Sequence, residues 1–377
     1  MRSVERLSVF LSAEKVGEMV LHNGNLAAFE YDRDWLGSGF PISPFSLPLE
    51  QKVFIPKMDP FAGLFGVFAD SLPDGWGRLL VDRLLLKNQF APAQAGNLTR
   101  LAIVGSSGMG ALRYVPEISL GNRPPESDLD EIAAECRNVL NTEYTDKLDE
   151  LFLLGGSSGG VRPKILTVIN GEEWIIKFPA LDDGKHSGRL EYAYSLCAKE
   201  CGILMEETKL FSSKQNEGYF GTRRFDRKMD VNNSAVRIHM LSVSGILETS
   251  HRIPNLDYDT LMKLTMVLTK DYSEIEKLFR IMCFNVFAHN RDDHAKNFSF
   301  IYNAEEERWQ LAPAYDLTHS YSIGGEHATT IHGNGRNPGR KDLLTVAKLI
   351  GFDERKAKGI ADEIFECVKC KLSEFVG

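Results

Sequence analysis

The sequence predicts an α+β protein of two lobes, with a small β-rich subdomain at the N-terminus and a helix-rich lobe at the C-terminus. Residues 1–30 alternate between apolar and polar side chains around a turn-like segment at 22–25, which is typical of strands. Two further strands are expected at 164–169 and 173–178. The later segments carry apolar residues at helical spacing, which predicts helices at 189–202, 257–270, 273–289, 341–350 and 354–375.

The length of 377 residues exceeds what one ordinary hydrophobic core supports, so two domains are expected. The polar, proline-containing segment 121–127 precedes a predicted helix at 128–140 and reads as a linker. We therefore predict an N-terminal domain over residues 1–122 and a second domain over residues 123–377. The first domain also contains a turn-rich run at 70–77, which leads into a predicted helix at 78–85.

Composition narrows the function classes. A formal net charge of −8 argues against autonomous binding of nucleic acid, which requires a basic surface. No apolar run has the length of a membrane span, and the first residues lack the apolar core of a signal peptide. We expect a cytoplasmic protein.

Six cysteines raise the question of a metal site. The pairs Cys197/Cys201 and Cys367/Cys370 have spacings that zinc ligands can have. Both pairs fall in predicted helices, and no histidine follows either pair at ligand spacing. We therefore expect reduced and mostly buried thiols.

The glycine-rich run GGSSGGVRPK at 155–164 is a candidate phosphate loop, because glycine lets the backbone approach phosphate oxygens closely. A similar run, GSSGMG, occurs at 105–110, and either can be an ordinary loop. Only the run at 155–164 precedes two predicted strands and a suitably placed lysine. It is not a Walker A loop, because no Gly-Lys-Ser/Thr ends it.

That lysine is Lys177, within an apolar predicted strand. A buried lysine requires anionic partners, although a lysine on an edge strand can also point to solvent. Beside a glycine loop it is typical of the strand lysine that binds phosphates in kinases. Glu191, near the start of the next helix, is its expected ion-pair partner; the alternative for Glu191 is a solvated carboxylate at a helix N-terminus.

The run NRDDHAKN at 290–297 is the most specific motif. Asp292 and Asn297 have the five-residue spacing of the catalytic base and the metal-binding asparagine of a kinase catalytic loop. A polar turn between two apolar segments is the alternative. His294 is expected to be structural or close to the nucleotide.

Asp316 follows a further predicted strand, in the run LAPAYDLT at 311–318. A carboxylate in this position is expected to be a second ligand for Mg²⁺, which prefers oxygen ligands and keeps several waters. The alternative is an aspartate that caps a helix.

With these four parts in chain order, the sequence resembles the HipA family, the kinase toxins of bacterial toxin–antitoxin pairs. The resemblance covers nearly the whole length, and residues 1–115 resemble the family's N-terminal domain. Six motifs carry it: FADSLPDGWG at 68–77, GSSGGVRPK at 156–164, IIKFP at 175–179, RFDR at 224–227, DDHAKNFS at 292–299 and APAYDL at 312–317.

The resemblance implies an ATP- and Mg²⁺-dependent serine/threonine kinase with a bilobed, protein-kinase-like fold. It implies that Asp292 is the catalytic base, that Asn297 and Asp316 bind Mg²⁺, and that Lys177 pairs with Glu191. The implied nucleotide contacts are Gly159, Gly160, Val161, Arg162, Pro163, Lys164, Lys177, Arg223, Arg224, Phe225, His294, Lys296, Asn297, Tyr315 and Asp316. Arg223 stands where many relatives have glutamate, so its contact with the adenine is expected from the backbone.

The resemblance also implies regulation and partners. Ser157 matches the family's autophosphorylated serine, with Ser158 as the alternative, and a phosphate there would expel the loop or repel ATP. The implied partners are a helix-turn-helix antitoxin of the HipB type, operator DNA through that antitoxin, and a protein of the translation machinery such as an aminoacyl-tRNA synthetase.

Two other functions are compatible with the sequence: a non-catalytic regulator that binds antitoxin and DNA, and a kinase for a small molecule. The intact Lys177, Asp292, Asn297 and Asp316 argue against the first, and the additional N-terminal domain argues against the second. The glycine-, asparagine- and histidine-rich segment 322–340 is expected to be a mobile loop near the acceptor site, or else a plain surface loop.

Overall fold

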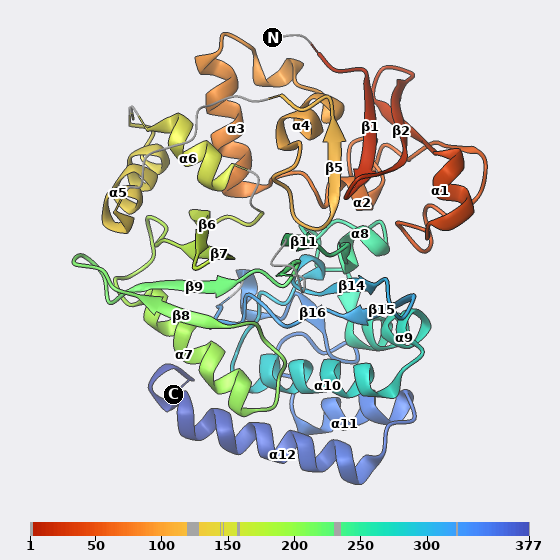
Figure 1. The fold of residues 1–377 in the computed structure, drawn as a ribbon. Coiled ribbons are helices and arrows are strands. Elements are labelled where there is room, and N and C mark those ends of the chain that lie inside the picture. The colour runs from red at the N-terminus through yellow and green to blue at the C-terminus, as the bar shows by residue number, and fades with distance from the viewer. Residues whose placement is uncertain are drawn as a thin grey trace.

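The computed structural model describes residues 3–118, 128–143, 145, 147–156, 159–229, 235–321 and 323–376. An N-terminal sheet with its helices lies at one end of the molecule, and a helix-rich lobe forms the other end (Figure 1). A second sheet lies between them, on the side of α7. This is the α+β organisation with two lobes that the sequence predicts.

The N-terminal sheet has five strands in the order β4-β3-β2-β1-β5, with antiparallel neighbours throughout. Its strands are β1 Arg6–Leu11, β2 Glu14–His22, β3 Leu26–Tyr31, β4 Val53–Phe54 and β5 Leu112–Val115. The alternation predicted for residues 1–30 is confirmed, because Leu7, Val9 and Met19 are fully buried. The helices of this region are α1 Arg33–Ser38, α2 Gly66–Ala69, α3 Gly75–Lys87, the 3-10 turn η1 Pro92–Gln94, and α4 Asn97–Val104.

Helix α3 shares a hydrophobic core with the chain that follows the N-terminal domain. Trp76 and Leu80 of α3 pack in one cluster with residues of α5 Leu129–Leu140, α6 Leu148–Gly155 and the strands β6 Lys164–Ile169 and β7 Glu172–Lys177. The linker predicted at 121–127 lies outside the described residues, so the domain boundary remains a prediction.

The second sheet has the order β6-β7-β9-β8. Its strands are β6 Lys164–Ile169, β7 Glu172–Lys177, β8 Thr208–Phe211 and β9 Tyr219–Arg223, and α7 Ser187–Glu200 packs against β8 and β9. Both strands predicted after the glycine loop are confirmed, the second shifted by one residue. Antiparallel pairing sets Lys164 opposite Lys177.

The C-terminal lobe is built on helices α9 Tyr258–Thr269, α10 Tyr272–Phe287, α11 Arg340–Leu349, α12 Glu354–Lys371 and α13 Ser373–Val376. The helix predicted at 354–375 is therefore divided in two, because the helical hydrogen bonding of α12 ends at Leu372. A three-stranded sheet lies on these helices, made of β12 Met240–Ser242, β14 Ser299–Asn303 and β15 Arg308–Leu311.

Short elements complete the described chain: β10 Arg227–Met229, β11 Ala235–Arg237, α8 Val243–Ile246, β13 Leu256–Asp257, η2 Ala295–Asn297, η3 Ile323–Gly325 and β16 Thr329–Thr330. Within the residues described, the helices are all too short or too polar to cross a membrane.

Candidate active site

The β14–β15 hairpin brings the catalytic-loop motif and Asp316 to one place. Phe300 pairs with Leu311, so Asn297, just before β14, and Asp316, just after β15, lie at the same end of the hairpin. Tyr315 fixes this arrangement, because its hydroxyl donates to the carbonyl of Lys296 at 2.7 Å. Residues nineteen positions apart in sequence are thereby joined directly.

The two aspartates of the loop have opposite surroundings. Asp293 is fully buried and accepts hydrogen bonds from the hydroxyl of Tyr258 and the backbone N–H of Thr329, each at 3.1 Å. Its carboxylate also lies 3.1 Å from Nδ1 of His327. Asp292 is exposed. Asp293 therefore anchors the loop, whereas the carboxylate of Asp292 is accessible from solvent.

The surroundings of Asp292 also suit a base. Loss of part of its hydration raises the pKa of Asp292, and repulsion from Asp316 and Asp293 acts in the same direction, against the attraction of His294. An ionised carboxylate with a raised pKa is a stronger base than an ordinary aspartate.

Lys177 joins the small sheet to the hairpin. Its Nζ lies 2.5 Å from Oε1 of Glu191 on α7 and also forms a hydrogen-bonded ion pair with Asp316. Burial opposes the charges of Lys177 and Asp316, but attraction between them outweighs it: the pKa of Lys177 is raised above its usual value, and that of Asp316 is held well below its own. The pair predicted between Lys177 and Glu191 is present.

A second lysine lies directly across the strands from the first. Lys164 is buried, and burial lowers the pKa of its ammonium group. Like charges at directly opposite positions of an antiparallel pair are unfavourable. Lys164 beside Lys177 therefore forms a place where an anion, such as a phosphate chain, is stabilised.

The described part of the glycine loop lies next to Lys164. Gly160 has a φ of 84°, and a Cβ at that position would come within 2.7 Å of Nζ of Lys164. Arg162 forms a bidentate ion pair with Asp183 at 2.9 and 3.1 Å, and Val161 is 80% exposed. The carbonyl of Pro163 accepts from the N–H of Phe178, which directly follows β7, so the end of the loop is fixed to the continuation of that strand. Ser157 and Ser158 lie outside the described residues, as does Ser322.

The N-terminal domain reaches into this site, which the sequence analysis did not anticipate. One carboxylate oxygen of Asp74 accepts from the backbone N–H of Gly160, and the other lies 2.8 Å from Nζ of Lys296. The backbone N–H of Trp76 donates to the carbonyl of Gly160 at 3.0 Å. A Cβ on Gly75, whose φ is 43°, would come within 2.4 Å of that carbonyl oxygen. The glycine loop is thus held between Asp74 and Trp76.

His294 has an unfilled hydrogen-bonding position. Its Nδ1 is buried and has no hydrogen-bond partner among the described residues. Its ring lies 5.4 Å from that of His251. Burial, and then the nearby charge of Lys296, lower the pKa of His251 to about 4. The predicted place of His294 next to a bound nucleotide remains a prediction.

The polar groups of Arg223 and Arg224 are already paired within the protein, and the backbone N–H groups of these two residues donate to the carbonyls of Glu207 and Glu173 at 2.9 Å each. Arg223 is paired with Glu172 at 2.6 Å, and Arg224 is buried against Asp226 at 2.7 Å. Phe225 stacks on Tyr315 with ring centroids 5.5 Å apart. The predicted adenine-side contact of residues 223–225 remains a prediction.

The candidate metal ligands have suitable chemistry. The side-chain amide nitrogen of Asn297 donates to the carbonyl of Asp292 at 2.6 Å, which commits the nitrogen and leaves the amide oxygen for a ligand. That oxygen and the carboxylate of Asp316 are the hard donors that Mg²⁺ prefers. The residues present fit the predicted ion.

The predicted loop after Asp316 lies against the catalytic loop over its described part. The N–H of Ala328 donates to the carbonyl of Arg291 at 3.0 Å, and Thr329 begins β16, which pairs in parallel with β13. This places the segment beside Asp292 and Asp293; its mobility remains a prediction.

The fold and the arrangement of these groups define a protein of the kinase-like class. Comparison with known proteins is specific to one branch of it. The family described as "HipA N-terminal domain" matches residues 7–115, and the family described as "HipA-like C-terminal domain" matches residues 156–371. The chain belongs to the HipA family.

Relatives and a solved structure agree with this assignment. The chain is 23% identical over 342 residues to the serine/threonine-protein kinase toxin HipA of Shewanella oneidensis, covering 82% of this chain and 74% of that protein. It is 24% identical over 349 residues to the putative kinase Y4mE of Sinorhizobium fredii, covering 84% and 77%. A chain in the structure of the Shewanella oneidensis HipA, HipB and operator DNA complex superposes with a TM-score of 0.71 at 18% identity, covering 98% of this chain and 90% of that one, which confirms the bilobed fold.

Proposed function

We propose that this protein is an Mg²⁺-ATP-dependent serine/threonine protein kinase with Asp292 as its catalytic base. The observation that carries the proposal is the ion pair of Lys177 with both Glu191 and Asp316. It joins the sheet beside the glycine loop to the hairpin end that holds Asp292 and Asn297. Phosphoryl transfer depends mainly on such positioning and charge stabilisation.

Each group has a defined task in the proposed reaction. Lys177 and Lys164 bind the phosphate chain, and Asp292 accepts the proton of the acceptor hydroxyl as its oxygen bonds to the γ-phosphorus. The bond from that phosphorus to the bridging oxygen breaks, and ADP leaves. Asn297 and Asp316 would hold Mg²⁺, which supplies positive charge to the phosphate oxygens.

The test is phosphate transfer by the full chain with Mg²⁺ and ATP, followed by mass spectrometry of the protein and of added acceptor proteins. Asp292→Asn should reduce transfer by about 10²–10⁴-fold, the usual contribution of a general base, while ATP affinity stays close to that of the unchanged protein. Asp149→Asn, which changes an exposed aspartate on α6, is the control and should retain full activity. Normal ATP binding without any transfer would contradict the proposal, and a large loss of ATP affinity in Asp292→Asn would contradict the base assignment.

We extend the proposal to regulation by the loop serines. Phosphate on Ser157, or on the adjacent Ser158, would add close to two negative charges to the glycine loop, which precedes the phosphate-binding lysines Lys164 and Lys177 in the chain. It would compete with the nucleotide for them and switch the kinase off. Mass spectrometry after incubation with ATP identifies the modified serine, and Ser157→Ala or Ser158→Ala should then prolong activity.

We further propose that the chain is the toxin of a toxin–antitoxin pair, with a small helix-turn-helix antitoxin as its partner. The solved relative was crystallised with HipB and operator DNA, which supports this partner type. The net charge of −8 favours DNA contact through the antitoxin rather than by this chain alone. Mobility-shift assays should show operator binding by the antitoxin and no binding by this chain alone. Transcription from the operator should be repressed by the pair. A translation-related protein, such as an aminoacyl-tRNA synthetase, is the proposed substrate.

A further inference from the structure

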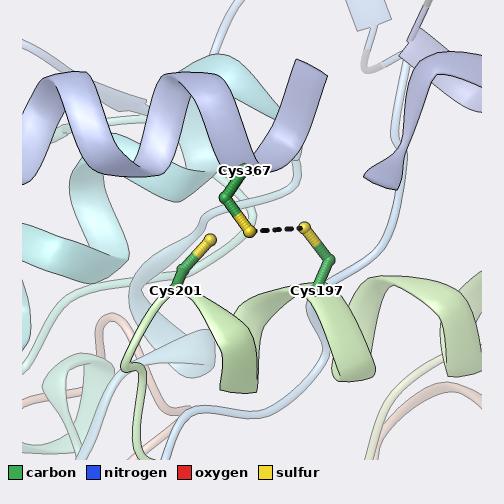
Figure 2. A group of neighbouring side chains, drawn as sticks. All are labelled: Cys197, Cys201 and Cys367. Carbon is green, nitrogen blue, oxygen red and sulfur yellow. Dashed lines mark hydrogen bonds between the residues drawn. The ribbon is translucent and has the colours of Figure 1, made fainter. Parts of the chain in front are cut away.

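Three cysteines from distant parts of the chain meet between α7 and α12 (Figure 2). Cys197 and Cys201 come from the end of α7, and Cys367 faces them from α12. The sulfur atoms of Cys197 and Cys367 are 4.0 Å apart, and all three sulfur atoms lie within 4.8 Å of one another. Cys197 and Cys201 are buried, whereas Cys367 is half-buried and gives access from the surface.

The distances match those of a metal–thiolate site. A zinc–sulfur bond of about 2.3 Å sets ligand sulfurs about 3.8 Å apart in a tetrahedral site and about 4.0 Å apart in a trigonal one. Starting from separations of at most 4.8 Å, the sulfur atoms need to approach by no more than about 1 Å. Side-chain rotation is sufficient for such a movement.

We propose that Cys197, Cys201 and Cys367 bind one zinc ion and thereby fasten α7 to α12. Thiolates are soft ligands that select zinc and other soft ions over Mg²⁺, so this site is chemically separate from the one at Asn297 and Asp316. The fourth position, on the side of the half-buried Cys367, would hold water.

The net charge of the zinc-bound site is small enough for a site near the surface. Three thiols lose their protons to solvent on binding Zn²⁺, which leaves a single net negative charge. Lys371, four residues after Cys367, is paired with Glu200 at 2.7 Å.

This group is distinct from ordinary buried cysteines. Cys136 and Cys283 are also buried, but neither belongs to a group of this kind. Across the part of the chain that the structure describes, no other set of three or more histidine, cysteine or acidic side chains is gathered closely enough to hold a metal.

The position of the site gives it a structural consequence. Helix α7 carries Glu191, the partner of Lys177, in its first turns and Cys197 in its last turns. A metal bond from α7 to α12 restricts movement of the helix that presents Glu191. The inference rests on the thiol geometry alone and does not depend on the proposed kinase activity.

The test measures zinc on the reduced full-length protein after incubation with Zn²⁺ and exhaustive dialysis. We expect stoichiometric zinc, a thiolate-to-metal charge-transfer band when Co²⁺ replaces it, and a higher thermal unfolding midpoint with zinc than without it. Cys367→Ser and Cys197→Ser should weaken zinc binding by at least the roughly 10–100-fold that loss of an outer-shell partner produces. They should also abolish the shift in the unfolding midpoint.

Two matched variants control for general effects of cysteine loss. Cys283→Ser removes a buried thiol of α10, and Cys370→Ser removes an exposed thiol one turn beyond Cys367; both should retain zinc. Cys367→Ser changes only a half-buried position and decides the test where Cys197→Ser does not fold. Absence of retained zinc from the unchanged protein overturns the proposal. Equal zinc loss in Cys283→Ser and Cys367→Ser also overturns it, as does a Cys197–Cys367 disulfide forming without any zinc binding by the reduced protein.

Discussion

Asp226 and Asp316 are both aspartates held by buried cations, yet they lie in regions with opposite properties. Asp226, at the contact with the N-terminal domain, is fully buried and accepts from Arg224, from Arg227 at 2.8 Å and from the backbone N–H of Gly110 at 2.6 Å. Asp316 is paired with Lys177 and keeps 36% of its side chain exposed. A carboxylate surrounded by donors fixes the fold, whereas one with an exposed side remains able to bind a ligand.

The sharpest test of this comparison is to remove each carboxylate. Asp226→Ala leaves two buried guanidinium groups without their main partner and should lower the free energy of unfolding by about 3–5 kcal/mol. Asp316→Ala should lower it by less than Asp226→Ala does, because Lys177 keeps Glu191, yet phosphate transfer should fall by about 10³-fold or more. Urea unfolding and transfer assays measure the two quantities.

The control for this pair is Lys87→Ala, which breaks an exposed ion pair with Asp149 and should change stability by less than about 1 kcal/mol. Equal loss of stability in Asp226→Ala and Asp316→Ala would show that the two carboxylates have the same role, contrary to the comparison.

Asp74 lies both at the domain contact and at the candidate active site, since it joins the N-terminal domain to the glycine loop and to Lys296. Asp74→Ala should reduce kcat/KM for ATP by about 10²-fold, the effect of a small displacement of a positioning group. Asp74→Asn keeps an acceptor for the N–H of Gly160 but loses the charge beside Lys296. Its kcat/KM for ATP should lie between that of Asp74→Ala and that of the unchanged protein. Asp149→Asn on α6, whose side chain is 42% exposed, is the control. Full activity in Asp74→Ala would rule out the positioning role.

A smaller effect concerns pH at the contact between the domains. His239 is buried, with its ring 2.8 Å from the carbonyl of Ile42, and burial lowers its pKa to about 4. Between about pH 6.5 and pH 4 the unfolded chain therefore binds more protons at this position than the folded chain. Stability falls as the pH falls through that window, by at most about 3 kcal/mol.

Replacement of His239 by glutamine should flatten this part of the stability profile. Urea unfolding at pH 7 and at pH 4.5 measures the difference, and the loss between the two should be smaller in His239→Gln than in the unchanged protein. His251 has a similarly lowered pKa and remains in the variant, so some acid sensitivity should persist. An unchanged slope in His239→Gln would exclude His239 as its source.

Sequence reasoning predicted what depends on local pattern and chain order. The strands β6 and β7 were expected as strand-like segments after the glycine loop, and the pairing of Lys177 with Glu191 was expected from a glycine loop, strand and helix in succession. It did not predict contacts between distant segments, because no local signal marks them. Asp74 meets Gly160 86 residues away, Asp226 meets Gly110 across 116 residues, and Cys197 meets Cys367 across 170. The spacing of the cysteines was visible, but the packing of α7 on α12 was not.

The close approach of glycines at the domain contact restricts how such proteins can evolve. A Cβ on Gly66 would come within 2.2 Å of the carbonyl oxygen of Gly245, and a Cβ on Gly75 within 2.4 Å of that of Gly160. Each pair joins the N-terminal domain to the rest of the chain with no room for a side chain. Exchange of one domain between distant relatives would therefore succeed only where the incoming backbone keeps both approaches, so the two domains are expected to be inherited as a unit.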